Sequence, residues 1–293
     1  MLKLKAVFVC LLWALCYPFI SIALSESPPL YLAFMRSILA GGTLLLFGMG
    51  SPGSVIPRAW SNWQSIGIVG FGYTSLGFSG MFLAGSLVSP GLATVVSNSQ
   101  PMIAVALAYV LAVERVTKRQ LAALTIGLVG IIAIVLPSLH HVQNNLSVGG
   151  IGFVLLGALG VALGNVWMKK IAVEANVLRV SAWQLIVGSI PLGIAALVLE
   201  DPSTIVFGSE ILVSLLVLAI PGTALATFMW FHVLKVGKLH RMNAFTFLTP
   251  LFALLIGAVF MGEVLQTNEL IGTAIIIGGI LVLHWPSSRI QTA

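Results

Sequence analysis

The sequence has little charge. Only 8% of its 293 residues are Asp, Glu, Lys or Arg, while 59% are hydrophobic. An ordinary soluble domain carries about 25% charged residues, which help to cover its surface. The composition therefore excludes a typical soluble protein of this length and indicates an integral membrane protein.

The residues that most intramembrane enzymes require are also scarce. The single Asp of the chain, Asp201, lies in a link between apolar runs, and neither an H-E-x-x-H pattern nor a P-loop occurs. Cys10 and Cys16 are the only cysteines, and six residues apart on one helix they face different ways. We therefore expect no enzyme, no cofactor, no metal site and no direct use of ATP. The net charge of +6 does not indicate nucleic acid, because the basic residues lie in links beside the apolar runs.

What the sequence does contain is a series of long apolar runs. Most are about 18–22 residues long, which is enough to cross roughly 30 Å of hydrocarbon as an α-helix. A transmembrane β-barrel would show short alternating segments instead. The fold class predicted is an all-α integral membrane protein with ten transmembrane helices, whose approximate ranges are 4–24, 30–48, 63–84, 89–112, 119–136, 149–171, 178–199, 210–234, 241–262 and 267–285.

A repeat divides the chain into two similar halves. Residues 97–134 align without a gap onto residues 246–283, at a single offset of 149. The offset pairs Pro101 with Pro250, Glu114 with Glu263, Leu121 with Leu270 and Gly130 with Gly279. Because five spans per half is an odd number, the second half must enter the membrane upside down relative to the first. The sequence thus predicts two inverted five-helix repeats, residues 1–143 and 144–293, an arrangement typical of secondary transporters.

The distribution of charge gives the orientation. Thirteen of the fourteen basic residues fall in links on one side of a ten-span arrangement, and the opposite links carry acidic residues such as Glu200, Asp201 and Glu210. Basic links stay cytoplasmic by the positive-inside rule. We therefore expect a multi-pass protein of the cell inner (plasma) membrane with both termini cytoplasmic. The first apolar run follows Lys3 and Lys5 as a signal peptide would, but it is long and no clear small-residue cleavage site follows it, so we expect it to be retained.

Together these features resemble a known family. Trp13 lies early in the first span, and Arg36 lies in the second span within Phe34-Met35-Arg36. With the ten spans in two repeats and the Pro…Glu pattern that closes the fourth and ninth spans, they are similar to the EamA family of the drug/metabolite transporter superfamily. The resemblance covers essentially the whole chain. It implies an exporter of amino acids, other metabolites or toxic compounds, and the YddG-like amino-acid exporters are the kind of member we expect.

Arg36 is the one basic residue placed inside a span. A charge in a span is costly, so it should face a partner or water. Glu263 closes the ninth span on the same side, and we hypothesise that Arg36 and Glu263 form a gate or structural pair. Two alternatives stay open: Arg36 extends to the membrane surface, or it contacts the carboxylate of a substrate.

Polar and aromatic residues in the middle of the spans are the candidates for a substrate cavity. Such residues also serve as helix–helix contacts or as interface anchors, which is the alternative for each of them. An apolar, aromatic cavity with a few amides suits a small amphipathic solute. Pro101 and Pro250 are candidate hinges, because each removes a backbone hydrogen bond. The cavity candidates are Trp13, Tyr17, Tyr73, Asn98, Asn165, Trp167, Thr227, Trp230 and Asn243.

The function predicted is a secondary transporter that exports small organic solutes by alternating access, with amino acids or related metabolites as the first substrate class. The alternatives are an exporter of drugs or other metabolites, or a channel or scaffold. The partners expected are a small-molecule substrate and the lipid bilayer, with a homodimer contact at the fifth and tenth spans, which carry almost no polar residues. No carboxylate lies deep in a span, since Glu114 and Glu263 both lie at helix ends, so proton coupling is not indicated and facilitated export stays open.

Overall fold

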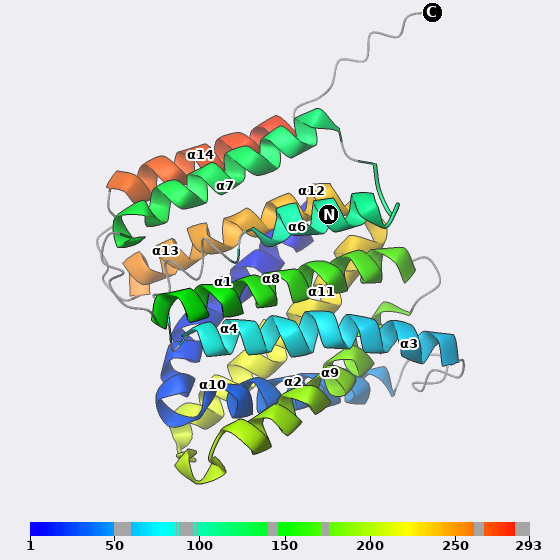
Figure 1. Cartoon of the computed structure of the whole chain (residues 1–293), viewed down its shortest axis with the longest axis vertical. Coiled ribbons are helices and arrows are strands. Elements are labelled where there is room, and N and C mark those ends of the chain that lie inside the picture. The colour runs from blue at the N-terminus through cyan, green and yellow to red at the C-terminus, as the bar shows by residue number, and fades with distance from the viewer. Residues whose placement is uncertain are drawn as a thin grey trace, which may run out of the picture.

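The described part of the chain is built of helices. The computed structural model describes residues 1–49, 60–85, 87, 97, 99–115, 117–139, 146–171, 176–260 and 267–284. Within these ranges every regular element is a helix, and the longer helices lie side by side in a stack (Figure 1). The predicted spans 89–112 and 241–262, and the boundary at residue 143, fall partly outside these ranges.

The helices follow the apolar runs closely. Their bounds in the first half are α1 Leu2–Glu26, α2 Pro29–Gly48, α3 Trp60–Val69, η1 Gly70–Leu76, α4 Gly77–Gly85, α6 Gln100–Val110 and α7 Lys118–Leu139. Those of the second half are α8 Leu146–Ile171, α9 Val177–Leu199, η2 Pro202–Thr204, α10 Ser209–Ala219, η3 Ile220–Leu225, α11 Ala226–Val236, α12 Leu239–Asn243, η4 Ala244–Phe247, α13 Leu248–Phe260 and α14 Thr267–His284.

Many of these helices are long enough to cross a membrane. Among the described residues, six helical segments combine the necessary length and hydropathy: 2–26, 29–48, 63–85, 149–171, 177–199 and 209–236. Two shorter apolar helices cover 100–110 and 270–282. Large apolar side chains also point outward on several of them, as expected where lipid replaces water. The chain is therefore a multi-pass membrane protein.

Several spans are not continuous α-helices, which the apolar pattern alone did not indicate. The segments η1 and η3 are π-helical and interrupt the spans formed by α3 and α4 and by α10 and α11. In the described part of the ninth span, α12 and a 3₁₀ turn lead into α13. Pro101 falls in the first turn of α6, and Pro250 falls near the start of α13, directly after the 3₁₀ turn η4.

Close helix contacts rely on glycine. The helix α4 packs on α8, and a Cβ added to Gly80 would meet backbone atoms of Phe153 and Gly157. On η1, a Cβ added to Gly70 would lie 2.6 Å from the carbonyl oxygen of Gln184 on α9. Small residues at these crossings let the backbones approach, which is a common basis of helix association in membranes.

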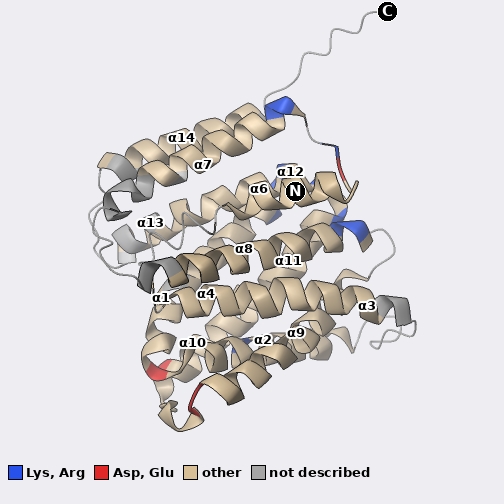
Figure 2. Cartoon of the chain, in the orientation of Figure 1, with Lys and Arg blue, Asp and Glu red and all other residues tan. Residues whose placement is uncertain are grey.

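Apart from Arg36, the charged residues that the structure describes lie at or near the ends of helices. Figure 2 shows Lys and Arg where α7 begins and where α8 ends, and acidic residues in the link that follows α9 at the opposite side of the bundle. That link provides a cap for α2. The side chain of Glu200 accepts hydrogen bonds from the N–H groups of Leu30 (2.9 Å) and Tyr31 (3.0 Å), which begin α2 and have no partner within the helix.

Candidate substrate site

Two tryptophans and an amide meet in the centre of the bundle. Trp13 on α1 and Trp230 on α11 pack edge to face, with ring centroids 5.3 Å apart. The indole N–H of Trp230 donates a hydrogen bond to Oδ1 of Asn165 on α8, at 3.0 Å. Trp230 and Asn165 are 0% and 1% exposed, so the bond is fully enclosed. The structure thus brings three of the sequence-derived candidates into direct contact.

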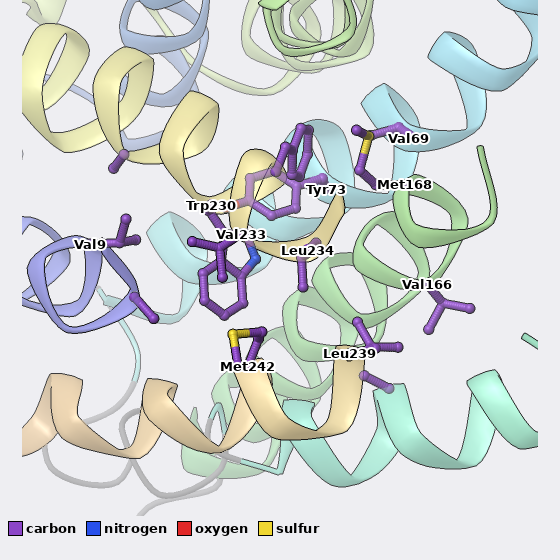
Figure 3. Packing of buried hydrophobic residues seen from close by; sticks show 14 of the residues in the cluster. Val9, Val69, Tyr73, Val166, Met168, Trp230, Val233, Leu234, Leu239 and Met242 are labelled. Atoms are coloured by element: carbon purple, nitrogen blue, oxygen red, sulfur yellow. The ribbon is translucent and has the colours of Figure 1, made fainter. Parts of the chain in front are cut away.

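A fourth candidate belongs to the same packing unit. Tyr73 on η1 is buried, and its ring lies 5.2 Å from that of Phe231 and 6.5 Å from that of Phe78. Figure 3 shows Tyr73, Trp230 and Met242 in one core, to which η1, α11 and α12 each contribute. Helices from both predicted halves therefore meet here.

Several polar atoms in this region lack a partner. Both side-chain atoms of Asn243, at the end of α12, are buried and have no hydrogen-bond partner among the described residues. The same holds for Nε1 of Trp167 and Nε2 of Gln100. Buried polar groups are nearly always paired, so unpaired ones mark places where a solute or water can bind.

The remaining candidates are placed as follows. Thr227 is buried on α11, one turn from Trp230. The ammonium of Lys170 lies 4.7 Å from the ring centroid of Trp167, in a cation–π contact. Asn98, Glu263 and the side chain of Tyr17 lie outside the described residues. The hypothesised contact between Arg36 and Glu263 therefore stays a hypothesis.

Arg36 lies within α2 and is only 3% exposed, so its side chain does not extend to the surface. Its Nε donates a hydrogen bond to Oγ1 of Thr223 at 2.6 Å. The guanidinium carbon lies 4.9 Å from the ring centroid of Phe78 and 5.7 Å from that of Phe82. The surroundings of this cation are thus aromatic and hydroxyl groups from α4 and η3.

A second polar cluster closes the end of the bundle where α6, α8 and α11 finish. Glu114 accepts hydrogen bonds from the N–H of Leu239 (2.8 Å) and from His240, whose Nδ1 lies 2.9 Å from Oε2. Nζ of Lys169 lies 3.9 Å from Glu114 and donates to the carbonyl oxygens of Leu234 (3.0 Å) and Gly237 (2.6 Å). The Glu114 carboxylate thereby binds the start of α12 directly, and through Lys169 it is linked to the ends of α8 and α11.

The cluster favours the ionised form of Glu114. Partial burial acts to raise the pKa of this carboxyl. The hydrogen bonds from His240 and Leu239, with the nearby positive charges, outweigh burial and hold the pKa below its ordinary value. The carboxylate therefore stabilises the folded protein above the unfolded-state pKa of about 4.5, and this stabilisation is lost as the pH falls through the lower folded-state pKa.

Replacing Glu114 with Gln is expected to lower the free energy of unfolding by about 1–3 kcal/mol at neutral pH, because a hydrogen-bonded charge is lost and donors are left unpaired. Thermal melting of the purified protein in detergent, from about pH 8 to about pH 3, checks this. The variant should lose the part of the acid dependence that Glu114 contributes, so its melting temperature should fall less on acidification than that of the wild type. The same change at the exposed Glu210 is the control. Equal profiles for E114Q and the wild type would contradict the assignment.

The basic residues nearest to Glu114 in the chain are Arg115 and Lys118. The structure pairs its carboxylate instead with Lys169 and His240, and the latter is 126 residues away. His240 had no recognisable signal, since it lies in an ordinary basic link. Phe78 and Phe82, the aromatic neighbours of Arg36, also lie within apolar runs, where nothing local in the sequence indicates this contact.

A bundle of apolar helices with buried amides, a buried indole and a buried cation defines a polytopic membrane protein. The model of the EamA-like transporter family matches residues 3–136 and 148–285, nearly the whole chain in two copies. The chain belongs to this family. It is accordingly a membrane transporter of small solutes, and the family is one of transporters rather than enzymes.

Several named proteins are similar to this chain in sequence, and one solved structure is similar in fold. The protein PecM of Dickeya dadantii is 29% identical over 97% of this chain and 93% of its own. A probable amino-acid metabolite efflux pump of Salmonella typhimurium is 27% identical over 94% and 92%. A WAT1-related chloroplastic protein of Arabidopsis thaliana is 28% identical over 89% of this chain, which spans 64% of that protein's length. One crystal structure, 20% identical, superposes with a TM-score of 0.83 over 97% of this chain and 96% of that chain, and shows the same fold.

Proposed function

We propose that the protein exports small organic solutes, with amino acids or related metabolites as the first class, by alternating access between two inverted five-helix repeats. The ten spans would lie in the inner membrane with both termini cytoplasmic. The contact between Trp13, Trp230 and Asn165 carries this proposal, and the unpaired amide of Asn243 follows Met242, a member of the same core. It brings aromatic rings and an amide together in the interior, where helices from both halves meet. The name of the Salmonella relative supports the substrate class.

The packing of the helices supports the inverted repeat. The second and seventh spans, α2 and α9, pack together, as do the fifth and tenth, α7 and α14. The third span packs on the sixth through α4 and α8, and the first on the eighth through α1, α10 and α11. Exchanging the two halves leaves this set of pairs unchanged. The π-helical segments η1 and η3 also begin 150 residues apart, close to the offset of the sequence repeat.

The same arrangement suggests roles for other elements. Pro101 and Pro250, in the first turns of α6 and α13, are the proposed hinges. The helices α7 and α14 pack on each other and expose apolar residues such as Val129 and Leu270, so they are the proposed site of a homodimer contact or of lipid.

Counterflow into proteoliposomes tests the function. Vesicles containing the full chain are loaded with one unlabelled amino acid each, aromatic ones included, and entry of the same labelled amino acid at trace concentration is followed. We expect saturable entry that requires the internal amino acid and is competed by external substrate. Protein-free vesicles and vesicles containing the E210Q variant are the controls. Absence of exchange with every amino acid, from protein shown to be folded, would overturn the amino-acid class.

A further inference from the structure

Arg36 is a permanently charged group in an unusual place. It lies seven residues into α2, about 10 Å along the axis from the start of the helix. A guanidinium keeps its proton at any physiological pH. With 3% of its surface exposed, Arg36 is therefore a buried cation within a segment that crosses the membrane.

The contacts of Arg36 do not neutralise this charge. No carboxylate of the described residues lies within ion-pair distance of it. Nη1 has no hydrogen-bond partner among the described residues, and Nη2 has only a long contact of 3.9 Å to the sulfur of Cys16. The rings of Phe78 and Phe82 compensate in part through cation–π interaction. A buried charge of this kind normally has an anionic partner.

Thr223 fixes the direction in which the guanidinium points. The hydroxyl of Thr223 donates its one proton to the carbonyl oxygen of Leu218, at 2.7 Å, across the π-helical segment η3. It can therefore only accept from Nε of Arg36, and does so at 2.6 Å. With Nε held, Nη1 is unpaired and Nη2 has only the long contact to Cys16, so these two nitrogens form the end of the fork that can donate to an anion. This end matches the two oxygens of a carboxylate.

The corresponding position in the second half shows that the fold does not need a charge here. Gln184 lies seven residues into α9, as Arg36 lies seven residues into α2. Oε1 of Gln184 accepts from Thr74 at 2.7 Å, and its Nε2 donates to the carbonyl oxygen of Ser181 at 3.4 Å. A neutral amide is thus satisfied in one half, while the other half keeps a cation with unpaired donors.

We propose that Arg36 binds the carboxylate of the transported solute through Nη1 and Nη2, and that Phe78 packs against the apolar part of the same solute. The proposal rests on the transport function proposed above and narrows its substrates to organic monocarboxylates, amino acids among them. Thr223 is a positioning residue in this arrangement. Amines and amides without a carboxylate are excluded as good substrates.

The test compares acids with their amides. The full-length protein in detergent is melted with increasing 3-phenylpropanoate or 3-phenylpropanamide, and with L-leucine or L-leucinamide. We expect the acids, and not the amides, to raise the melting temperature of the wild type. Arg36→Gln should weaken acid binding at least about tenfold, while Arg179→Gln, the same change near the start of α9, should leave it unchanged.

Further variants keep the test decisive if R36Q folds poorly. Arg36→Lys keeps the charge but removes the fork, so acid binding should weaken while acids remain preferred over amides. Thr223→Val should weaken acid binding less than R36Q, with the preference for acids kept. Glu263→Gln should leave acid affinity within about twofold; tenfold tighter binding would show that Glu263 normally holds Arg36 and would overturn the assignment.

The proposal is overturned if acids and amides stabilise the wild type equally, or if R36Q and R36K bind acids as the wild type does. Its failure is distinguishable from failure of the transport function. An Arg36-dependent stabilisation by acids without counterflow of any solute would keep the site and refute the transporter. Counterflow that is indifferent to the carboxylate and to Arg36 would keep the transporter and refute the site.

Discussion

Replacing Gly80 with alanine is expected to destabilise the protein strongly, whereas the same change at Gly67 in the same span is expected to be neutral or stabilising. A Cβ at position 80 would lie 2.5 Å from the backbone nitrogen and 2.6 Å from the Cα of Gly157. Backbone atoms cannot rotate away, so α4 and α8 would have to separate. Overpacking of this kind costs about 1–3 kcal/mol or more. At Gly67 no atom lies within 4 Å of the added Cβ.

The measurement is the melting temperature of each variant in detergent, followed by size-exclusion chromatography. Alanine at an open helical position gains about 0.5–1 kcal/mol over glycine, so G67A and G80A should shift in opposite directions. Similar melting temperatures for both variants would show that the contact between α4 and α8 yields more easily than the geometry indicates.

Replacing Trp230 with phenylalanine is expected to lower the free energy of unfolding by about 1–3 kcal/mol beyond the effect of lost volume, because Oδ1 of Asn165 is left buried without its donor. Replacing Trp230 with alanine should be worse, by about 3–5 kcal/mol in total, since the side chain is fully buried. Both effects are large beside the marginal stability of most proteins.

A double-mutant cycle separates the hydrogen bond from the packing. In N165L/W230F both partners of the bond are apolar, so the double variant should recover much of what W230F loses. Thermal melting of the four proteins gives the coupling, and counterflow of the folded variants reports on transport. Additive losses in the double variant would mean that the bond contributes little and that Asn165 is held by packing alone.

How well the sequence predicted each feature of the structure depends on how far apart in the chain the residues that determine it lie. Hydropathy and length are local properties, and they predicted the helical membrane class and the helix positions closely. The family followed from Trp13, Arg36 and the repeated Pro…Glu pattern. The ten-span count and the inverted repeat remain predictions that the pairing of helices supports.

The site was harder to predict, because its contacts join residues far apart in the chain. Trp230 and Asn165 were both candidates, but nothing local indicated that they share a hydrogen bond across 65 residues. The π-helical segments have no clear sequence signature beyond glycine and proline, yet η3 places Thr223 against Arg36. The partners of Glu114 are likewise set by how three helix ends meet.

The helix cap at Glu200 has a consequence for how the protein is made. The N–H groups of Leu30 and Tyr31, which begin α2, donate to the carboxylate of Glu200, about 170 positions later in the chain. During synthesis, these N–H groups stay uncapped until Glu200 has been made, when most of the polypeptide has emerged. The cap of α12 differs, since Glu114 has already been made when Leu239 appears. The first turn of α2 is therefore capped only by a residue of the second half. A nascent chain that stops before residue 200 has unpaired N–H groups at the start of α2.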